Sequence, residues 1–106
     1  MDVMIRRRRT PRRREASKDT TQFLVGLAAV TRTIRTRDKL SQAEVARRAG
    51  LGTKFVSAVE NGRANPTVRH MGQLAEGLGL AGAAELASRA EGATRRIADA
   101  TTWPIG

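Results

Sequence analysis

The sequence predicts an all-α fold, in which five helices form one small domain behind a disordered, basic N-terminal arm. Three observations predict it. Apolar residues recur at spacings of three and four along most of the chain, which is the period of an amphipathic helix, and no segment alternates convincingly as strands do. Glycines follow several of these periodic segments, where they can end helices. The 106 residues, 40% of them hydrophobic, suffice for one small core.

Residues 1 to 18 carry a net charge of +6 and no apolar period. Adjacent like charges repel one another and nothing apolar offsets that cost, so we expect this arm to be disordered. Such an arm suits a polyanion: on a nucleic acid it would track phosphates or enter a minor groove, and the alternative is a solvated tail without function. Its arginines are Arg6, Arg7, Arg8, Arg9, Arg12, Arg13 and Arg14.

The first two helices have clear sequence signals. An apolar stripe predicts the first helix over residues 21–37. Ser41 and Glu44 have the spacing of a capping box, so a second helix should begin at Gln42, and Gly50 should end it. The stripe of the first helix consists of Phe23, Leu27, Val30 and Ile34.

Three further helices are predicted over 53–61, from Thr67 to Gly79 and over 82–98. The fourth should bury Val68, Met71, Leu74 and Leu78. The fifth has an apolar side formed by Leu86, Ala90, Ala93 and Ile97, which either packs on the domain's own helices or forms a dimer surface. The chain thus divides into an arm (1–18), a helical domain (19–80) and a C-terminal helix and tail (81–106).

Composition narrows the function. The chain has no cysteine, and a lone His70 is weak support for a metal site or a catalytic base, so we expect no enzyme, no metal and no cofactor. No apolar run approaches the roughly 20 residues that span a bilayer, and no export signal is recognisable, which predicts a cytoplasmic, nucleoid-associated protein without a membrane partner. The net charge of +10 favours a polyanion, and three aromatic residues are too few for a single-strand stacking platform.

Two short helices around Gly50 have the spacing of a helix-turn-helix. Counted from Gln42 as position one, Ala46 falls at position five and Gly50 at nine. A small residue at position five lets the second helix pack closely, and glycine at nine can adopt the left-handed conformation of a tight turn. This arrangement turns four residues away from the core, where they would face a major groove: Thr53, Lys54, Ser57 and Ala58.

The stretch from Leu40 to Leu80 resembles the phage-repressor-like family of DNA-binding domains, of the Cro and cI type or XRE type. The Leu-Ser-Gln start, the Ala-Gly turn, the Val-Glu-Asn-Gly exit and the Asn-Pro-Thr segment before the fourth helix occur together in order. The resemblance implies a five-helix lambda-repressor-like domain whose third helix reads base edges of double-stranded DNA. It also implies a transcriptional regulator, a repressor in our interpretation, that binds a palindromic operator as a homodimer.

The resemblance assigns roles to individual residues. Thr53, Lys54, Ser57 and Ala58 would read bases. Phosphate contacts would come from Gln42, Asn61, Arg63 and Arg69. Arg35 and Glu60 would form an internal ion pair that is structural rather than catalytic. Two positions depart from the family, because Lys39 replaces a usual glycine and Gly52 replaces a usual serine or threonine cap.

A second function stays open at this stage. The protein would then be an antitoxin or an accessory DNA-binding subunit that autoregulates its operon while residues 81–106 bind a protein partner. The near-neutral charge of this segment and Trp103 in its tail motivate the alternative.

Overall fold

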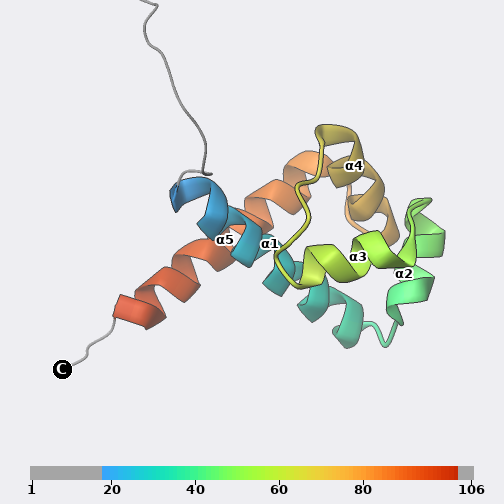
Figure 1. The fold of residues 1–106 in the computed structure, drawn as a ribbon. Coiled ribbons are helices and arrows are strands. Elements are labelled where there is room, and N and C mark those ends of the chain that lie inside the picture. Colours follow the sequence, from blue (N-terminus) through green and yellow to red (C-terminus); the bar gives the residue numbers. More distant parts are fainter. Residues whose placement is uncertain (1–17, 103–106) are drawn as a thin grey trace, which may run out of the picture.

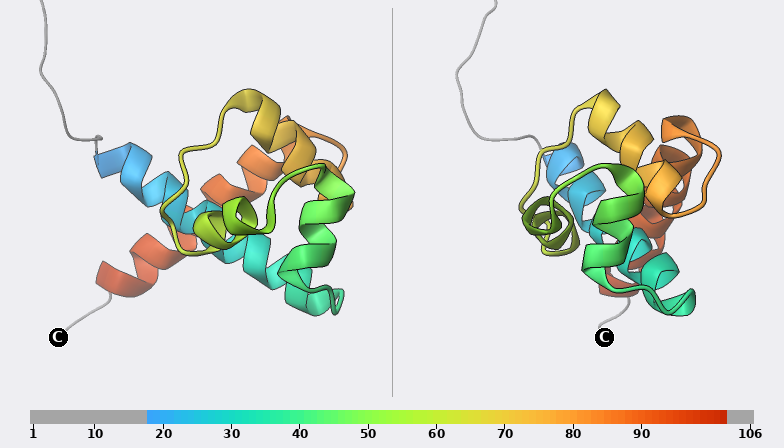
Figure 2. Two further views of the ribbon diagram at one scale, coloured as in Figure 1. Left: turned by 45° about the vertical axis from the view of Figure 1, so that its right-hand side comes forward. Right: turned by 90° about the vertical axis from the view of Figure 1, so that its right-hand side faces the viewer.

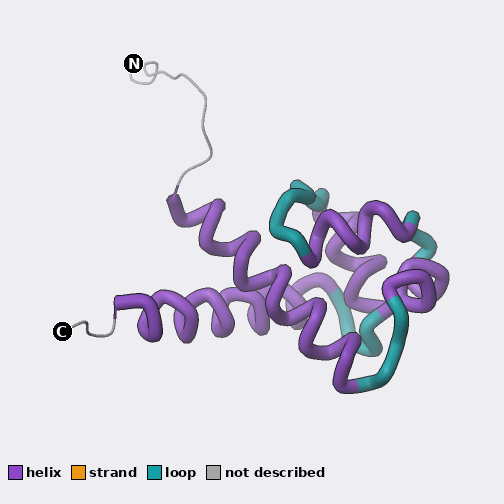
Figure 3. The backbone as a smooth tube through the Cα atoms, turned by 60° about the horizontal axis from the view of Figure 1, so that its bottom comes forward, coloured by secondary structure: helices purple, strands orange, loops and turns teal. Residues whose placement is uncertain are grey.

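The computed structural model describes the backbone of residues 18–102 and the side chains of residues 20–100. Within that range the chain forms five helices and no strand (Figures 1 and 3). They are α1 (Lys18–Arg37), α2 (Gln42–Ala49), α3 (Thr53–Glu60), α4 (Val68–Gly77) and α5 (Ala83–Thr102). The predicted all-α, five-helix fold is confirmed, whereas the basic arm and Trp103 lie outside the described residues.

The two long helices, α1 and α5, cross each other, and α1 lies between α5 and α3 (Figure 2). The crossing needs a glycine at position 26, because a Cβ atom there would collide with the carbonyl oxygen of Ala90 and the hydroxyl of Thr94. That hydroxyl lies 2.7 Å from the carbonyl oxygen of Ala90 and 3.1 Å from that of Gln22 on α1. Direct backbone approach therefore sets the distance between the two helices at this point.

One hydrophobic core joins all five helices. Leu86, Ala90 and Ala93 of α5 are buried in it, so this part of the apolar side packs on the chain's own helices. Ile97, one turn further on, is 37% exposed. The largest fully buried side chains are Leu27, Thr31, Val45, Val56, Val59, Leu74 and Leu86.

One expectation about the core is wrong. Val68 shares the helical period of Met71 and Leu74, yet its side chain is 80% exposed. It is the first residue of α4, directly after the cap Thr67, and no other described element covers this end of the helix. Periodicity extends an apolar stripe along a helix, but it cannot tell where the neighbouring helices end.

Candidate nucleic-acid interface

Local hydrogen bonds fix both ends of α2, as the sequence predicts. The Glu44 amide donates to Ser41 Oγ at 3.0 Å, and the Ser41 amide donates to Glu44 Oε1 at 3.0 Å. Gly50 ends the helix with a φ of 70°, a left-handed conformation that glycine adopts without steric cost. The next amide, of Leu51, donates to the carbonyl oxygen of Ala46 at 2.9 Å, so the chain turns at once toward α3.

Helix α3 has one anchored face and one open face. Val56 and Val59 are buried in the core on the anchored face. Thr53 and Lys54, in its first turn, are exposed. One turn later Ser57 and Ala58 are half-buried, and Ala58 packs against the core. Figure 1 shows α3 crossing the front of the molecule, with α2 to one side and α4 above it.

A buried carboxylate joins α3 to α1 and α2. Arg35 of α1 donates from Nε to Glu60 Oε2 at 2.5 Å and from Nη2 to Oε1 at 2.9 Å, which makes a bidentate pair. Gln42 of α2 donates from Nε2 to Oε1 at 3.0 Å. The third nitrogen of Arg35, Nη1, donates to the carbonyl oxygen of Leu40 in the loop between α1 and α2 at 2.9 Å. The last turn of α3 is therefore held by α1 and α2, and the loop between these helices in turn fixes Arg35.

Opposing effects act on the pKa of Glu60. Burial of the carboxylate raises the pKa, but the hydrogen bonds from Arg35 and Gln42, together with the positive charges of Arg35 and Arg32, outweigh it and lower the pKa below its usual value. The carboxylate is therefore ionised at neutral pH and stays available as an acceptor. A charged Glu60 is compatible with its complete burial because its oxygens are paired.

The other residues assigned to phosphates lie around the two ends of this unit. Asn61, just after α3, donates from Nδ2 to the carbonyl oxygen of Ser57 at 2.9 Å and so caps the helix. Arg63 follows in the α3–α4 connection, Arg69 lies in the first turn of α4, and both are exposed. Gln42 is the first residue of α2, with its side-chain nitrogen on Glu60 rather than in solvent.

Gln73 and His70 of α4 also contact the α2–α3 unit. Gln73 of α4 lies with Nε2 at 3.2 Å from the carbonyl oxygen of Ala49 and 3.3 Å from that of Gly50, at the turn between α2 and α3. The ring of His70 lies 4.6 Å, centroid to centroid, from that of Phe55 in α3. His70 Nδ1 also accepts from the Thr67 amide at 3.2 Å, a capping box whose spacing is visible in the sequence, whereas nothing there marks Gln73.

The two departures from the family pattern are accommodated locally. Lys39 has a φ of 59°, so it adopts the left-handed conformation for which glycine is usual. Gly52 precedes α3 with extended dihedral angles, and no side chain caps the helix. The α1–α2 loop therefore contains a left-handed residue that is not glycine, and α3 begins without a side-chain cap.

Comparison with known proteins places these features in a family. Residues 32–83 match the family model described as Helix-turn-helix, from the second half of α1 to the start of α5. A hypothetical transcription factor, NHTF from Neisseria, is 36% identical, with a TM-score of 0.57 over 65% of this chain and 76% of that one. No curated protein sequence matches the chain.

Two more solved structures share the fold at lower identity. The clp gene regulator ClgR from Corynebacterium glutamicum is 20% identical, with a TM-score of 0.67 over 76% of this chain and 84% of that one. A mutant of the restriction-modification controller protein C.Esp1396I is 21% identical, with a TM-score of 0.58 over 71% of this chain and 90% of that one.

Other kinds of site find no support in the described part of the chain. Among those residues no three His, Asp or Glu side chains gather where they could hold a metal ion. No helix in residues 18–102 combines the length and the apolar character needed to cross a membrane.

The matched model, the 36% identical relative and the shared fold show that the chain belongs to the helix-turn-helix family of phage-repressor-like, XRE-type DNA-binding regulators.

Proposed function

We propose that the protein is a sequence-specific repressor that binds a palindromic operator in double-stranded DNA as a homodimer. One observation carries the DNA-reading part of the proposal: the first turn of α3 exposes Thr53 and Lys54, while the last turn of the same helix is fixed through buried Glu60. The repressor role, the palindrome and the homodimer rest on the resemblance to the family. A helix that is anchored at one end and exposed at the other can enter a major groove at a defined angle. Such a protein would work on the nucleoid, in the cytoplasm.

The proposal divides the contacts into two kinds. Lys54 would donate to the O6 and N7 atoms of guanine, and the methyl group of Thr53 would touch that of thymine. Ser57 and Ala58, which are half-buried, would approach bases only where the groove reaches the second turn. Phosphates would be held by Gln42, Asn61, Arg63 and Arg69. Arg63 and Arg69 are exposed, so they could reach a DNA backbone without rearrangement of the protein interior.

An in vitro selection from random duplexes tests the operator. We expect a palindromic consensus with half-sites about one helical turn apart, because two-fold protein symmetry imposes that spacing. A consensus without symmetry, or no enrichment at all, would contradict the homodimer.

Gel shifts then separate base contacts from phosphate contacts. We expect the double variant Thr53→Ala/Lys54→Ala to lose about tenfold or more of its preference for the selected operator over random duplex, since a good base contact contributes about 1–3 kcal/mol of discrimination. Arg63→Ala is the matched control, because loss of a phosphate contact should weaken both duplexes alike. An unchanged preference in the double variant would overturn the base-reading assignment.

The arm, Arg6 to Arg14, is proposed to add affinity for DNA without adding specificity. Deletion of residues 1–14 should weaken binding to every duplex. It should also reduce the slope of log K against log salt by about 0.9 for each phosphate that the arm neutralises. An unchanged slope would leave the arm without a role on DNA.

A role as antitoxin or accessory subunit is the second candidate. The partial exposure of Ile97 on α5 favours a partner on residues 81–106. Co-purification from the native host tests it, and recovery of the protein alone at every salt concentration would count against it.

A further inference from the structure

A groove of about 530 Å³ lies between α1 and α5, on the side of α1 that faces away from α3. Arg35 marks the side of α1 toward α3, where it pairs with Glu60. Thr33 and Arg37 line the groove, and each lies two residues from Arg35, or about 200° around the helix. An occupant of the groove would therefore leave the open face of α3 uncovered.

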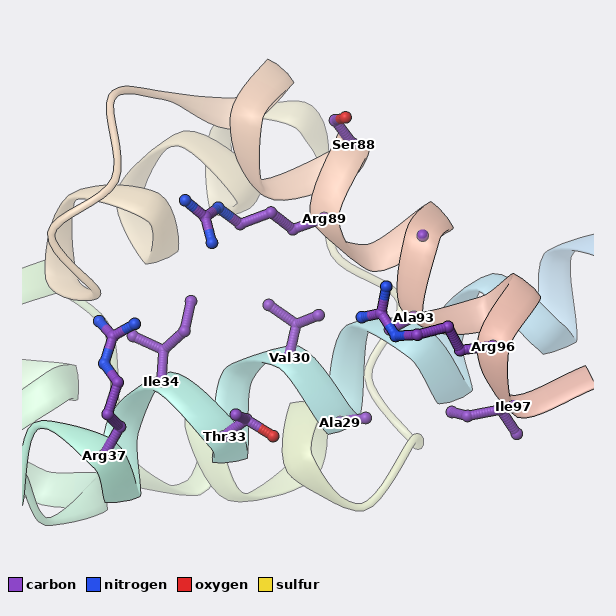
Figure 4. Close-up of a pocket in the computed structure, with 11 residues that line it drawn as sticks. Ala29, Val30, Thr33, Ile34, Arg37, Ser88, Arg89, Ala93, Arg96 and Ile97 are labelled. Carbon is purple, nitrogen blue, oxygen red and sulfur yellow. The ribbon is translucent and has the colours of Figure 1, made fainter. Parts of the chain in front are cut away.

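The floor of the groove is apolar. It is lined by Ala29, Val30 and Ile34 from α1 and by Ala93 and Ile97 from α5 (Figure 4); Val30, Ile34 and Ala93 are mostly buried, whereas Ile97 is 37% exposed. Lining residues extend from 29 to 37 on α1 and from 88 to 97 on α5. At 1.5 Å per residue, the two walls are about 12 and 13.5 Å long, which corresponds to rather more than two turns of an α-helix.

Three guanidinium groups surround this floor, from Arg37, Arg89 and Arg96, and no carboxylate lines the groove (Figure 4). Arg37 pairs with Asp38 at 2.9 Å and Arg89 with Glu85 at 2.9 Å, both at the exposed surface. Arg96 has no ion-pair partner among the residues that the structure describes. The groove thus combines an apolar floor with an excess of positive charge.

We propose that this groove binds an acidic amphipathic helix of a partner protein. The apolar stripe of that helix would lie on the floor, and its Asp and Glu side chains would reach the three arginines. Arg37 and Arg89 would have to give up their present ion pairs to bind the partner, whereas Arg96 would not. The groove is open to solvent, so a helix can enter it from the side. An enclosed pocket, which would cover most of a small molecule, is the more usual shape for a small ligand.

Charge argues against occupants from the same chain. Residues 1–17 contain only Asp2 and Glu15 against seven arginines, and residues 103–106 contain no acidic side chain. A second copy carries the same three arginines at its own groove, so two copies placed groove to groove would repel each other. An acidic partner offers the better match in charge, and it adds a protein contact to the DNA-binding function.

Selection with a phage-displayed library of helical peptides against the full-length protein tests the proposal. We expect the enriched peptides to carry an apolar stripe flanked by Asp and Glu. A fluorescein-labelled enriched peptide then gives a Kd by fluorescence anisotropy, with its Glu-to-Lys counterpart as the control probe. Enrichment of peptides without acidic residues, or equal affinity for the two probes, would overturn the proposal.

Two variants place the binding in the groove. A Cβ atom at Gly92 would meet only Arg96 Nη1, at 3.6 Å, so α5 accepts a side chain at this position. Because Gly92 lines the groove, we expect Gly92→Leu to obstruct it, and leucine also favours the helix. It should abolish peptide binding. Arg96→Glu should weaken it by about tenfold or more, whereas Arg95→Glu, an equal change of charge at an exposed residue outside the groove, should weaken it much less.

Three control measurements show why Gly92→Leu loses peptide binding. DNA binding and helix content distinguish a blocked groove from misfolding, and the oligomeric state distinguishes it from loss of a dimer. Gly92→Leu should bind a random duplex as the unchanged protein does, and circular dichroism should show the same helix content. Equal loss of peptide binding in Arg95→Glu and Arg96→Glu would indicate general attraction and contradict the proposal. Conversion of a dimer to a monomer by Gly92→Leu in sedimentation would assign the groove to a second copy instead, and would equally overturn it.

Discussion

The two sides of α1 are built by different physical means. Toward α3, side chains with directional hydrogen bonds make the contact, and one buried carboxylate receives Arg35 and Gln42. Toward α5, the helices meet through small residues and through the backbone itself at Gly26. The stability of the α1–α3 contact should therefore depend on charge and hydrogen bonding, and that of the α1–α5 contact on side-chain volume. Substitutions on the two sides can test this difference.

Removal of the buried carboxylate should have the largest effect. Glu60→Ala leaves Arg35 and Gln42 without their acceptor, and we expect a loss of about 3 kcal/mol in the free energy of unfolding, measured by urea denaturation. Glu91→Ala is the control, because Glu91 is an exposed residue of α5 and its removal should change stability by about 0.5 kcal/mol or less. A similar result for the two variants would show that the network does not hold α3.

A methyl group at the helix crossing should cost somewhat less. Gly26→Ala introduces a Cβ atom against the Ala90 carbonyl and Thr94, and we expect a loss of about 2 kcal/mol, because overpacking forces the helices apart. Gly72→Ala is the same substitution inside α4 with no atom in its way, and it should stabilise the protein by up to about 1 kcal/mol. Thermal unfolding of both variants shows whether their effects have opposite signs, and equal signs would contradict the close approach.

A pH effect follows from Glu60. Its pKa is lower in the folded protein than in the unfolded chain, so the unfolded chain takes up the proton first as the pH falls. The stability that Glu60 contributes is complete above its ordinary pKa, about 4.3, and is lost as the pH falls from there through the folded value. Urea denaturation between pH 7 and pH 3 should show a smaller decline for Glu60→Gln than for the unchanged protein. Parallel declines would mean that other carboxylates dominate acid unfolding.

Removal of a buried hydroxyl should stabilise the protein. Thr31 Oγ1 is fully buried in α1 without a hydrogen-bond partner among the described residues. Thr31→Val keeps the shape and removes the unpaired group, so we expect a gain of about 1 kcal/mol in the free energy of unfolding. Thr33→Val, at an exposed position two residues further, should change little. A loss of stability in Thr31→Val would indicate that the hydroxyl has a partner after all.

The smallest effect concerns the start of α3. A Cβ atom at Gly52 would meet nothing within 4 Å, so a serine there is free to cap the helix. Gly52→Ser should raise stability by a few tenths of a kcal/mol, measured by chemical denaturation. A decrease would show that α3 needs the freedom of glycine at the position before its first residue.

Local signals explain why the fold could be predicted from the sequence. The capping box of Ser41 and Glu44 and the turn at Gly50 depend on residues close together in the chain, and the structure confirms both. Contacts between residues far apart in the chain have no such local signal in the sequence. The residues around Gly26 in the sequence do not indicate that Ala90 and Thr94 will lie against it. Periodicity also led to the wrong prediction that Val68 is buried.

The candidate site shows the same limit. Spacing placed Thr53 and Lys54 at the start of the third helix, and the pairing of Arg35 with Glu60 was inferred from resemblance to a family rather than from the residues themselves. Gln73 lies far along the chain from Ala49 and Gly50, whose carbonyl groups it contacts. Only a structure brings such residues together, because side-chain amides carry no pattern that marks their partners.

The crossing at Gly26 also limits how relatives of this chain can diverge. Replacement of Thr94 by a smaller residue would remove its hydroxyl and so one of the two obstacles to a side chain at position 26. The carbonyl oxygen of residue 90 belongs to every amino acid, so no substitution on α5 removes the second obstacle. Homologues that lack glycine at this position must therefore shift one helix along the other, and aligned sequences should reveal that shift as coordinated changes along both helices.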